Sequence, residues 1–240
     1  MNLILLAPAD FTSAHQARIV DPRRLRHLRE VHRAAPGSEL TVGMEGGLLG
    51  RGRLIRLDQT CAEFEVTLDQ PPPAALPLHL LLALPRPRML ARTLENVAAL
   101  GVKRLTLLHT QRVEKSFWQS PELAPERIRD HFVLGLEQAR DTVMPQIDFA
   151  PRFKPFVEDR LPKLIAGRRA LLAHPGMPHP CPRGLPVEDR QEYVLAIGPE
   201  GGFIPYEVDR LLAAGFEGVH LGPRILRVET AVVALVARLF

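Results

Sequence analysis

Residues 194–205 read Val-Leu-Ala-Ile-Gly-Pro-Glu-Gly-Gly-Phe-Ile-Pro, an apolar run followed by a glycine-rich turn and a proline. This pattern predicts a buried strand that leads through a tight turn into a helix starting at Pro205, because proline suits the first turn of a helix. The glycines allow a ligand to approach the backbone closely, and the helix amino terminus offers free N–H groups. The alternative is an ordinary turn between a strand and a helix.

The same stretch lacks the signatures of two common nucleotide sites. A phosphate loop needs a Lys-Ser or Lys-Thr pair, which is missing here, and no G-x-G-x-x-G occurs in the chain. A nicotinamide-dependent oxidoreductase, the class that an α/β pattern alone would suggest, therefore lacks its fingerprint.

A second motif follows at residues 219–231, which read Val-His-Leu-Gly-Pro-Arg-Ile-Leu-Arg-Val-Glu-Thr-Ala. It predicts a strand, a loop and a closing helix. Residues 232–240 are apolar almost all round, so this helix must be buried against its own sheet or another subunit. Arg224, Arg227 and Glu229 directly precede the apolar stretch. They either serve a site or form a charged loop that caps a core helix.

The region around these motifs alternates between strand and helix patterns. Short apolar strands are predicted at 78–84, 105–108, 170–173, 193–197 and 218–221. Helices are predicted after the first strand, closing at Gly101, and from about Pro125 to Arg140. The alternation predicts an α/β fold with a parallel, helix-covered sheet that keeps its ligands outside the carboxyl ends of the strands.

The first part of the chain has a different pattern. Strand-like runs at 3–6, 39–42, 48–57 and 61–68 predict a small β-barrel or sandwich. Pro71-Pro72-Pro73 and Pro77 can continue neither a helix nor a ladder, so they read as a stiff connector. We therefore expect a domain at 1–70, a linker at 71–77 and a second domain at 78–240.

Basic side chains gather in the first domain, although the formal net charge is only +4. Twenty-seven of the 31 basic residues are arginine, a bias that a GC-rich genome would produce without any function. Six of them fall between residues 18 and 33, where His27 and His32 also lie, and Arg86 and Arg88 follow the first strand of the second domain. Either these positions bind RNA or they are solvated surface, and for residues 18–33 the sequence favours neither. The six arginines are Arg18, Arg23, Arg24, Arg26, Arg29 and Arg33.

Composition excludes several classes of protein. With 46% hydrophobic and 24% charged residues the chain is too apolar to be disordered. Cys61 and Cys181 form neither a disulfide framework nor a zinc spacing, which favours a reducing compartment. No secretory signal or membrane-spanning run is present, so we expect a cytoplasmic protein that does not bind membranes.

Two further groups of side chains suggest weaker hypotheses. His174, His179 and Cys181 share a proline-rich loop, but they lack a fourth ligand and a usual spacing, so we expect no metal. Trp118 has the shape to stack on a base, with Phe117 and Arg112 nearby, although a lone tryptophan more often serves packing.

Residues 197–203 and 221–231 together resemble the signature pair of the small-subunit rRNA uridine N3-methyltransferases, which belong to the trefoil-knotted SPOUT methyltransferases. The pair is highly specific, and weaker matches extend the resemblance over essentially the whole chain. These matches are His27-Leu28 with Val31, Arg33 and Gly37, then Leu100-Gly101-Val102, and Glu137-Gln138 with Pro145.

The resemblance implies a two-domain homodimer. Its first domain would be a PUA-like β-barrel that binds RNA, and its second a SPOUT domain with a carboxyl-terminal knot. The knot would bind S-adenosylmethionine, and the enzyme would methylate N3 of one uridine in the 16S rRNA of the small ribosomal subunit. A threaded chain is a rare exception among folds, and periodicity does not predict it.

Three loops would hold the cofactor in this family: the turn after Ala173, the glycine turn and the threaded loop before the last helix. The residues implied are His174, Ile197, Gly198, Pro199, Glu200, Gly201, Gly202, Leu221, Gly222, Pro223, Ile225, Leu226, Arg227 and Thr230. Adenine would be held mainly by backbone groups and apolar walls.

The chemistry at N3 suggests roles for four side chains. The imide proton must leave as the methyl group arrives, so negative charge develops on the uracil oxygens. Arg227 and Arg224 are suited to stabilise that charge. Glu200 and Glu229 are the nearby carboxylates that would take or relay the proton, unless Glu229 only caps the final helix. No metal is needed.

Some positions depart from the family pattern. Members usually carry Gln-Lys where this chain has Glu95-Asn96, a glutamate at Ala99 and an arginine at Asp141. A methyltransferase with another RNA target is therefore one alternative. A non-catalytic RNA-binding or ribosome-assembly protein on the same scaffold is another.

Overall fold

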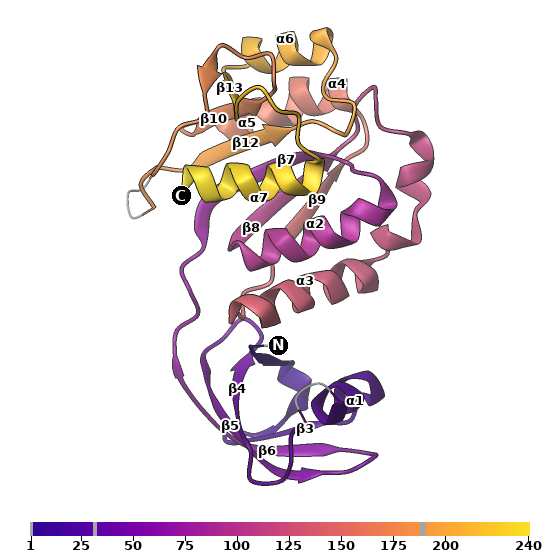
Figure 1. Ribbon diagram of the computed structural model, residues 1–240, viewed down its shortest axis with the longest axis vertical. Helices are drawn as coiled ribbons and strands as arrows, with labels where there is room; N and C mark the ends of the chain where they lie inside the picture. The colour runs from indigo at the N-terminus through magenta and orange to yellow at the C-terminus, as the bar shows by residue number, and fades with distance from the viewer. Residues whose placement is uncertain (1, 31–32, 188–190) are drawn as a thin grey trace. The chain divides into compact units, whose positions relative to one another are not determined.

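The computed structural model describes residues 2–30, 33–187 and 191–240, so Val31 and His32 lie outside the described residues. The chain divides into two compact units (Figure 1). The first unit contains the described residues up to Ala74 together with Val133–Met144, and the second contains Ala75–Phe132 and Pro145–Phe240. The linear domain prediction assigned residues 133–144 to the second domain, whereas they pack with the first unit.

The first unit is built on a six-stranded sheet in the order β1-β4-β5-β6-β3-β2. β1 and β4 are parallel and the other neighbours are antiparallel. The strands are β1 (Ile4–Leu6), β2 (Phe11–Ser13), β3 (Gln16–Ile19), β4 (Glu39–Met44), β5 (Leu49–Leu57) and β6 (Ala62–Gln70). A short 3-10 helix (Pro8–Asp10) and the helix α1 (Pro22–Glu30) connect parts of this sheet.

The core of the first unit forms where α1 covers the sheet. Leu25 and Leu28 of α1 are buried with Ile4, Val42 and Phe64 of the strands. The period of the helix leaves Arg23, Arg26 and Arg29 on its exposed side. The apolar stripe therefore fixes which side of α1 presents arginines to solvent.

The four strands predicted in this region are present as β1, β4, β5 and β6. β2 and β3 were missed because they are short, with no buried residue in β2 and only two in β3. Arg18 lies on β3, and Arg33 lies beyond α1 with a positive φ of 49°. The basic cluster therefore spans a strand, a helix and a turn.

Residues 133–144 are tied to the first unit by hydrogen bonds. Glu137 accepts Leu5 N–H at its Oε1 (3.1 Å) and Asn2 N–H at its carbonyl (3.2 Å). The Thr142 hydroxyl donates to the Gly47 carbonyl (2.6 Å), and the Thr142 carbonyl accepts Gly46 N–H (2.8 Å). Burial raises the pKa of Glu137, while the Leu5 N–H bond opposes that rise. This segment therefore belongs to the fold of the first unit.

The second unit contains a seven-stranded sheet in the order β11-β13-β10-β12-β7-β8-β9, and all its neighbours are parallel. Its strands are β7 (Leu76–Ala83), β8 (Val102–Leu108), β9 (Gln146–Ala150), β10 (Arg169–Ala173), β11 (His179–Pro180), β12 (Tyr193–Ile197) and β13 (Glu217–His220). An α/β fold with a parallel sheet is thus confirmed.

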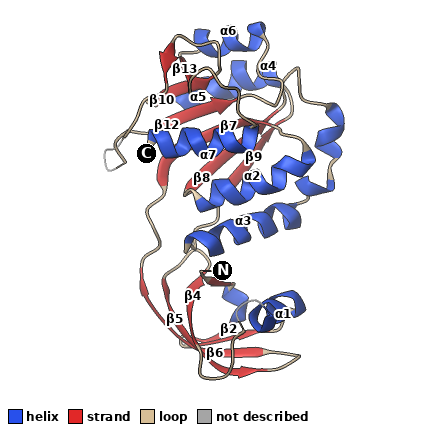
Figure 2. Cartoon of the chain, in the orientation of Figure 1, coloured by secondary structure: helices blue, strands red, loops and turns tan. Residues whose placement is uncertain are grey.

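Helices cover both faces of this sheet. α2 and α7 pack against each other on one face (Figure 2). The helices of the second unit are α2 (Pro87–Ala99), α4 (Phe153–Pro155), α5 (Leu161–Ile165), α6 (Pro205–Ala213) and α7 (Val228–Leu239). The helix α3 (Pro125–Ala139) begins in the second unit, and its residues from Val133 onward belong to the first. Two 3-10 turns (Lys115–Gln119 and Pro121–Leu123) precede α3, and a π-helical turn (Phe156–Arg160) joins α4 to α5.

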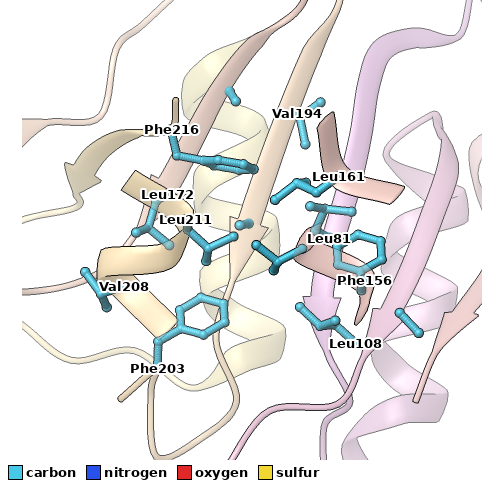
Figure 3. Close-up of a cluster of buried hydrophobic side chains, with 14 residues drawn as sticks. Leu81, Leu108, Phe156, Leu161, Leu172, Val194, Phe203, Val208, Leu211 and Phe216 are labelled. Carbon is cyan, nitrogen blue, oxygen red and sulfur yellow. The ribbon is translucent and has the colours of Figure 1, made fainter. Parts of the chain in front are cut away.

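A buried cluster between the strands and α5 and α6 forms a core of the second unit (Figure 3). Leu81, Leu172 and Val194 of the strands meet Leu161 of α5 and Leu211 of α6. Because side chains alternate along a strand, Leu80, Leu82, Leu171 and Leu195 belong to the opposite face, where they are also buried. Burial on both faces explains why these strands read as continuous apolar runs.

The predicted strands of this region are present as β7, β8, β10, β12 and β13, whereas β9 and β11 were missed. The predicted helices are also present. The predicted Pro125–Arg140 helix ends one residue early, because Arg140 takes a positive φ of 55°. The last helix starts at Val228 and includes Glu229 and Thr230, which were expected in the loop before it. Within the described ranges, no helix has the length and apolarity needed to cross a lipid bilayer.

Candidate functional site

A cavity of about 230 Å³ lies at the carboxyl ends of β10, β12 and β13 in the second unit. Three loops converge on it: the turn after Ala173, the glycine turn after Ile197 and the loop after His220. Val228, Ala231 and Leu235 of α7 complete its wall. The cavity occupies the edge at which parallel α/β sheets keep their ligands.

Most of the predicted cofactor-binding residues line this one cavity. They are His174, Ile197, Gly198, Pro199, Glu200, Gly201, Gly202, Leu221, Gly222, Ile225 and Leu226, joined by Arg224 from the predicted catalytic set. Pro223, Arg227 and Thr230 are not in the lining. Sequence reasoning missed Phe203, Val219, His220 and the α7 side chains, since an apolar residue at a strand end or on a buried helix looks like any core residue.

The glycine turn fits tightly against its own backbone. A Cβ placed on Gly198 would lie 3.0 Å from the Phe203 nitrogen and 3.1 Å from the Phe203 ring. Gly202 takes a φ of 74° and donates its N–H to the Pro199 carbonyl (2.7 Å). A larger residue at position 198 would therefore have to displace the turn that walls the cavity.

Two glutamates hold this turn to neighbouring segments. Glu200 accepts the Arg86 N–H at Oε1 (3.0 Å), just before α2 begins. Glu207, only 2% exposed in the first turn of α6, accepts Ile204 N–H (3.0 Å) and Gln111 N–H (2.7 Å). The side chain of Glu207 also lies in the first turn of α6, where a carboxylate stabilises the helix end. Both side chains thus hold backbone in place.

Two histidines line the cavity from adjacent strand ends. His174 follows β10 and accepts Gly176 N–H at Nδ1 (3.1 Å), and His220 ends β13 and accepts Gly222 N–H at Nδ1 (2.9 Å). In both rings Nδ1 therefore acts as a hydrogen-bond acceptor for the turn that follows the strand. Burial first, and then the charge of Arg112, lowers the pKa of His174.

The four predicted catalytic residues occupy different environments. Arg224 is exposed on the cavity wall, while Arg227 is exposed at the residue that caps α7. Glu229 is buried in the first turn of α7, where a carboxylate stabilises the helix end. Glu200 lines the cavity but already accepts a backbone N–H. The catalytic roles stay predictions.

The arginines predicted to bind RNA also differ in their surroundings. Arg24 is half-buried, and its guanidinium donates to Asp10 Oδ2 and to the Leu5 carbonyl (2.7 Å each). Arg18 forms an exposed ion pair with Glu63 (3.7 Å). The remaining predicted arginines are exposed, namely Arg23, Arg26, Arg29 and Arg33 of the first unit and Arg86 and Arg88 of the second. Arg24 therefore serves the packing of the first unit.

Trp118 and the loop with Cys181 were singled out in the sequence for base stacking and metal binding. Trp118 donates its Nε1–H to His109 Nδ1 (2.9 Å) and meets Phe149 edge-on, so the ring contributes to packing. Burial raises the pKa of the Cys181 thiol. Across the described part of the chain, no three His, Cys, Asp or Glu side chains gather in a metal-binding arrangement.

The fold and the site together define an α/β domain with a cavity at its strand ends, in a chain that also contains a small β-sheet unit bearing exposed arginines. The chain belongs to the RNA methyltransferase domain family, whose model matches residues 72–240. The family resemblance predicted from the paired motifs is confirmed.

Curated relatives and solved structures cover nearly the whole chain. The ribosomal RNA small subunit methyltransferase E of Treponema pallidum is 29% identical over 99% of this chain and 90% of its own. That of Synechocystis is 28% identical over 90% of this chain and 70% of its own.

Among solved structures, the methyltransferase E of Neisseria gonorrhoeae bound to S-adenosyl methionine aligns with a TM-score of 0.72 at 24% identity, covering 97% of this chain and 94% of its own. A putative methyltransferase of Legionella pneumophila, in complex with the same cofactor, aligns with a TM-score of 0.73 at 21% identity. The alignment covers 98% of this chain and 95% of the Legionella chain. These two structures share the fold of this chain.

Proposed function

We propose that this protein is an S-adenosylmethionine-dependent methyltransferase that modifies N3 of a uridine in the 16S rRNA of the small ribosomal subunit. The observation that carries the proposal is the convergence of three loops, distant in sequence, on one cavity at the strand ends. The family and the names of the curated relatives support RNA as the substrate. The cofactor found in the Neisseria and Legionella structures supports the methyl donor.

The residues of the cavity fit this cofactor. Ile197, Leu221 and Leu226 offer apolar walls for a nucleoside, while the glycine turn lines the cavity without side chains. Burial lowers the pKa of His174, which disfavours a positive charge on this ring near a sulfonium ion. S-adenosylmethionine supplies an electrophilic methyl group: a bond forms from N3 to that carbon, the C–S pair stays on sulfur, and N3 loses its proton.

The residues of this chain would then align and stabilise the reacting uracil. Arg224 lines the cavity, and Arg227 lies three residues further along the same loop, where it caps α7. Both side chains are exposed and are suited to the negative charge that develops on the uracil oxygens. Glu200 and Glu229 already serve the glycine turn and the start of α7. We therefore assign charge stabilisation to the arginines and expect the proton to leave to solvent at the open mouth.

The finer architecture belongs to this proposal. We infer that the second unit is a SPOUT-type knot, which is supported by the order β13-β10-β12 and by the cavity shared between the loop after β13 and the turn after β10. We infer that the first unit is a PUA-like RNA-binding domain, supported by its antiparallel strands and the arginines of α1. An enzyme of this kind would act in the cytoplasm, where ribosomes assemble.

We further infer a homodimer. Ile225 is 82% exposed and Leu226 and Val233 are also exposed, so the loop before α7 and one side of α7 present apolar surface. Such a patch suits a second copy of this chain better than solvent. Gel filtration with light scattering is expected to give twice the mass of the chain, and a monomer would contradict the inference.

The experiment that tests the function is methyl transfer from labelled S-adenosylmethionine to small ribosomal subunits that lack native methylation. Mass spectrometry of the nucleosides is expected to find N3-methyluridine. Arg227→Ala is expected to lower kcat about 100-fold with cofactor binding intact, because a charge-stabilising donor is lost. The control is Arg127→Ala, an exposed arginine of α3.

Each of the other outcomes of this experiment would indicate a different function. Another methylated base would mean that the departures at Glu95, Asn96, Ala99 and Asp141 accompany a new target. Cofactor binding without transfer to RNA would favour the ribosome-assembly alternative. Failure to bind the cofactor at all would refute the proposal.

A further inference from the structure

The loop that follows β8, residues 109–113, is fixed at almost every position. His109 donates its N–H to the Ala150 carbonyl (2.8 Å) and accepts Trp118 Nε1–H at its ring. Gln111 N–H is held by Glu207 (2.7 Å), and Val113 is buried. The backbone on both sides of Arg112 is therefore held in place.

The side chain of Arg112 reaches from this loop to the glycine turn. Its guanidinium donates a hydrogen bond to the carbonyl of Gly201, a residue of the cavity wall. A Cβ on Gly201 would lie 2.9 Å from Arg112 Cδ, so the stem of the arginine rests directly on the glycine. After burial, the charge of Arg112 is the second cause of the lowered pKa of His174, which lines the cavity.

Most of the hydrogen-bonding capacity of this guanidinium remains unused. Arg112 is exposed, and in the described ranges it makes no other hydrogen bond and no ion pair. A guanidinium carries five N–H donors in a planar fork that matches paired oxygens. Arg112 is thus anchored by one donor, with the others facing solvent at the edge of the cavity.

We propose that Arg112 is a substrate-binding residue of this site, which holds an anionic oxygen of the RNA against the glycine turn. This inference rests on the proposed function. The oxygen belongs either to a backbone phosphate beside the target or to the uracil ring as it loses its N3 proton. The contact with Gly201 fixes the direction of the Arg112 guanidinium, so the bound oxygen is held at a fixed position relative to the cavity.

The turn itself does not depend on Arg112. Gly202 N–H bonds the Pro199 carbonyl, and Glu207 and Glu200 hold the two sides of the turn. Removal of Arg112 is therefore expected to change the affinity for S-adenosylmethionine by no more than about threefold. If Arg112 instead held the turn in place, its removal would lower that affinity strongly.

The test compares Arg112→Ala and Arg112→Lys with the wild-type protein, with Arg127→Ala as the control for loss of an exposed arginine. Cofactor affinity is measured by calorimetry, methyl transfer by initial rates, and equilibrium binding to a small-subunit rRNA fragment by anisotropy at several salt concentrations. Arg112→Ala is expected to lower kcat/KM about 100-fold, and Arg112→Lys to regain about tenfold because it keeps the charge.

The two sources of the oxygen give different patterns, and both support the proposal. For a phosphate, KM rises and the slope of log affinity against log salt falls by about 0.7 to 0.9 in Arg112→Ala. For the uracil oxygen, kcat falls while KM and the salt slope stay the same. Wild-type kinetics in Arg112→Ala, or a loss that matches a loss of cofactor affinity, would overturn it.

A failure of the proposed function would be seen separately, in the wild-type protein itself. If the wild type transfers no methyl group, the anisotropy data still decide the role of Arg112. Without methyl transfer no negative charge develops on the uracil ring, so the backbone phosphate is the only source of the oxygen that remains. A reduced salt slope in Arg112→Ala then keeps Arg112 as an RNA contact, and an unchanged slope rejects it.

Discussion

Gly198 lets the glycine turn of the cavity wall pack closely against Phe203. Its missing side chain leaves room between the turn and the Phe203 backbone, which a Cβ would approach to 3.0 Å. Phe203 is itself buried in the core that anchors α6. The glycine is therefore required by packing at this position, even though its φ lies outside the left-handed region.

The substitution Gly198→Ala is expected to weaken S-adenosylmethionine binding about tenfold or more and to lower the free energy of unfolding by about 1 to 3 kcal/mol, because the added methyl overpacks the turn. Calorimetry and urea unfolding would measure the two effects. In Gly176→Ala, the control, the new Cβ would meet nothing nearer than 3.4 Å. Equal effects of both substitutions would contradict this account of Gly198.

A buried histidine makes the second unit sensitive to acid. His79 of β7 bonds the Thr106 hydroxyl through Nε2 (2.8 Å), and burial, with Arg104 nearby, lowers its pKa to about 4. In the unfolded chain the pKa of histidine is about 6.5. Between these values the unfolded state binds more protons, so this stabilisation is complete above about pH 6.5 and is lost as the pH falls to 4.

We expect His79→Gln to remove this contribution, which amounts to about 3 kcal/mol at the acid end. Urea unfolding at several pH values would show a stability that falls less steeply between pH 6.5 and 4 in the variant than in the wild type. His15→Gln, at an exposed histidine of the first unit, serves as the reference. An unchanged slope in His79→Gln would show that the histidine is protonated in the folded state.

At the scale of the elements, the sequence was most informative where strands are buried on both faces. β7, β10 and β12 read as apolar runs because helices cover them from both sides. β9 was missed because it is an edge strand with Phe149 38% exposed, so it lacks an apolar run. Short exposed strands such as β2 and β11 give no periodic signal either.

The candidate site shows the same limit. The glycine and arginine motifs identified the loops, and the family resemblance predicted that the loops together bind a cofactor. Their meeting at one cavity depends on the order β13-β10-β12, which no local pattern encodes. The wall formed by Val228, Ala231 and Leu235 could not be told from ordinary core residues of an apolar helix.

At the scale of the whole molecule, the first unit is not a contiguous piece of sequence. Residues 133–144 supply the Glu137 and Thr142 contacts to Leu5 and to the turn at Gly46-Gly47. Domain boundaries inferred from a proline-rich linker assume that each domain is one segment. That assumption explains why the linear prediction differs from the compact units at this segment.

A fragment of residues 1–74 is accordingly expected to lack a cooperative urea transition, since buried groups such as the Leu5 N–H lose their partners. Circular dichroism would follow unfolding of the fragment and of the whole protein. Addition of a peptide of residues 133–144 should restore part of the transition. A fragment that unfolds as sharply alone as with the peptide would show that the segment is dispensable.

The discontinuous first unit also constrains how the protein emerges during translation. Its early strands must wait until residue 144 has been added, about 70 residues later, which takes roughly 4 to 14 s at about 5 to 20 residues per second. Throughout that interval β7, α2 and β8 of the other unit are already leaving the ribosome. Nascent β4 and β5 would thus remain accessible to chaperones for seconds, although they lie near the start of the chain.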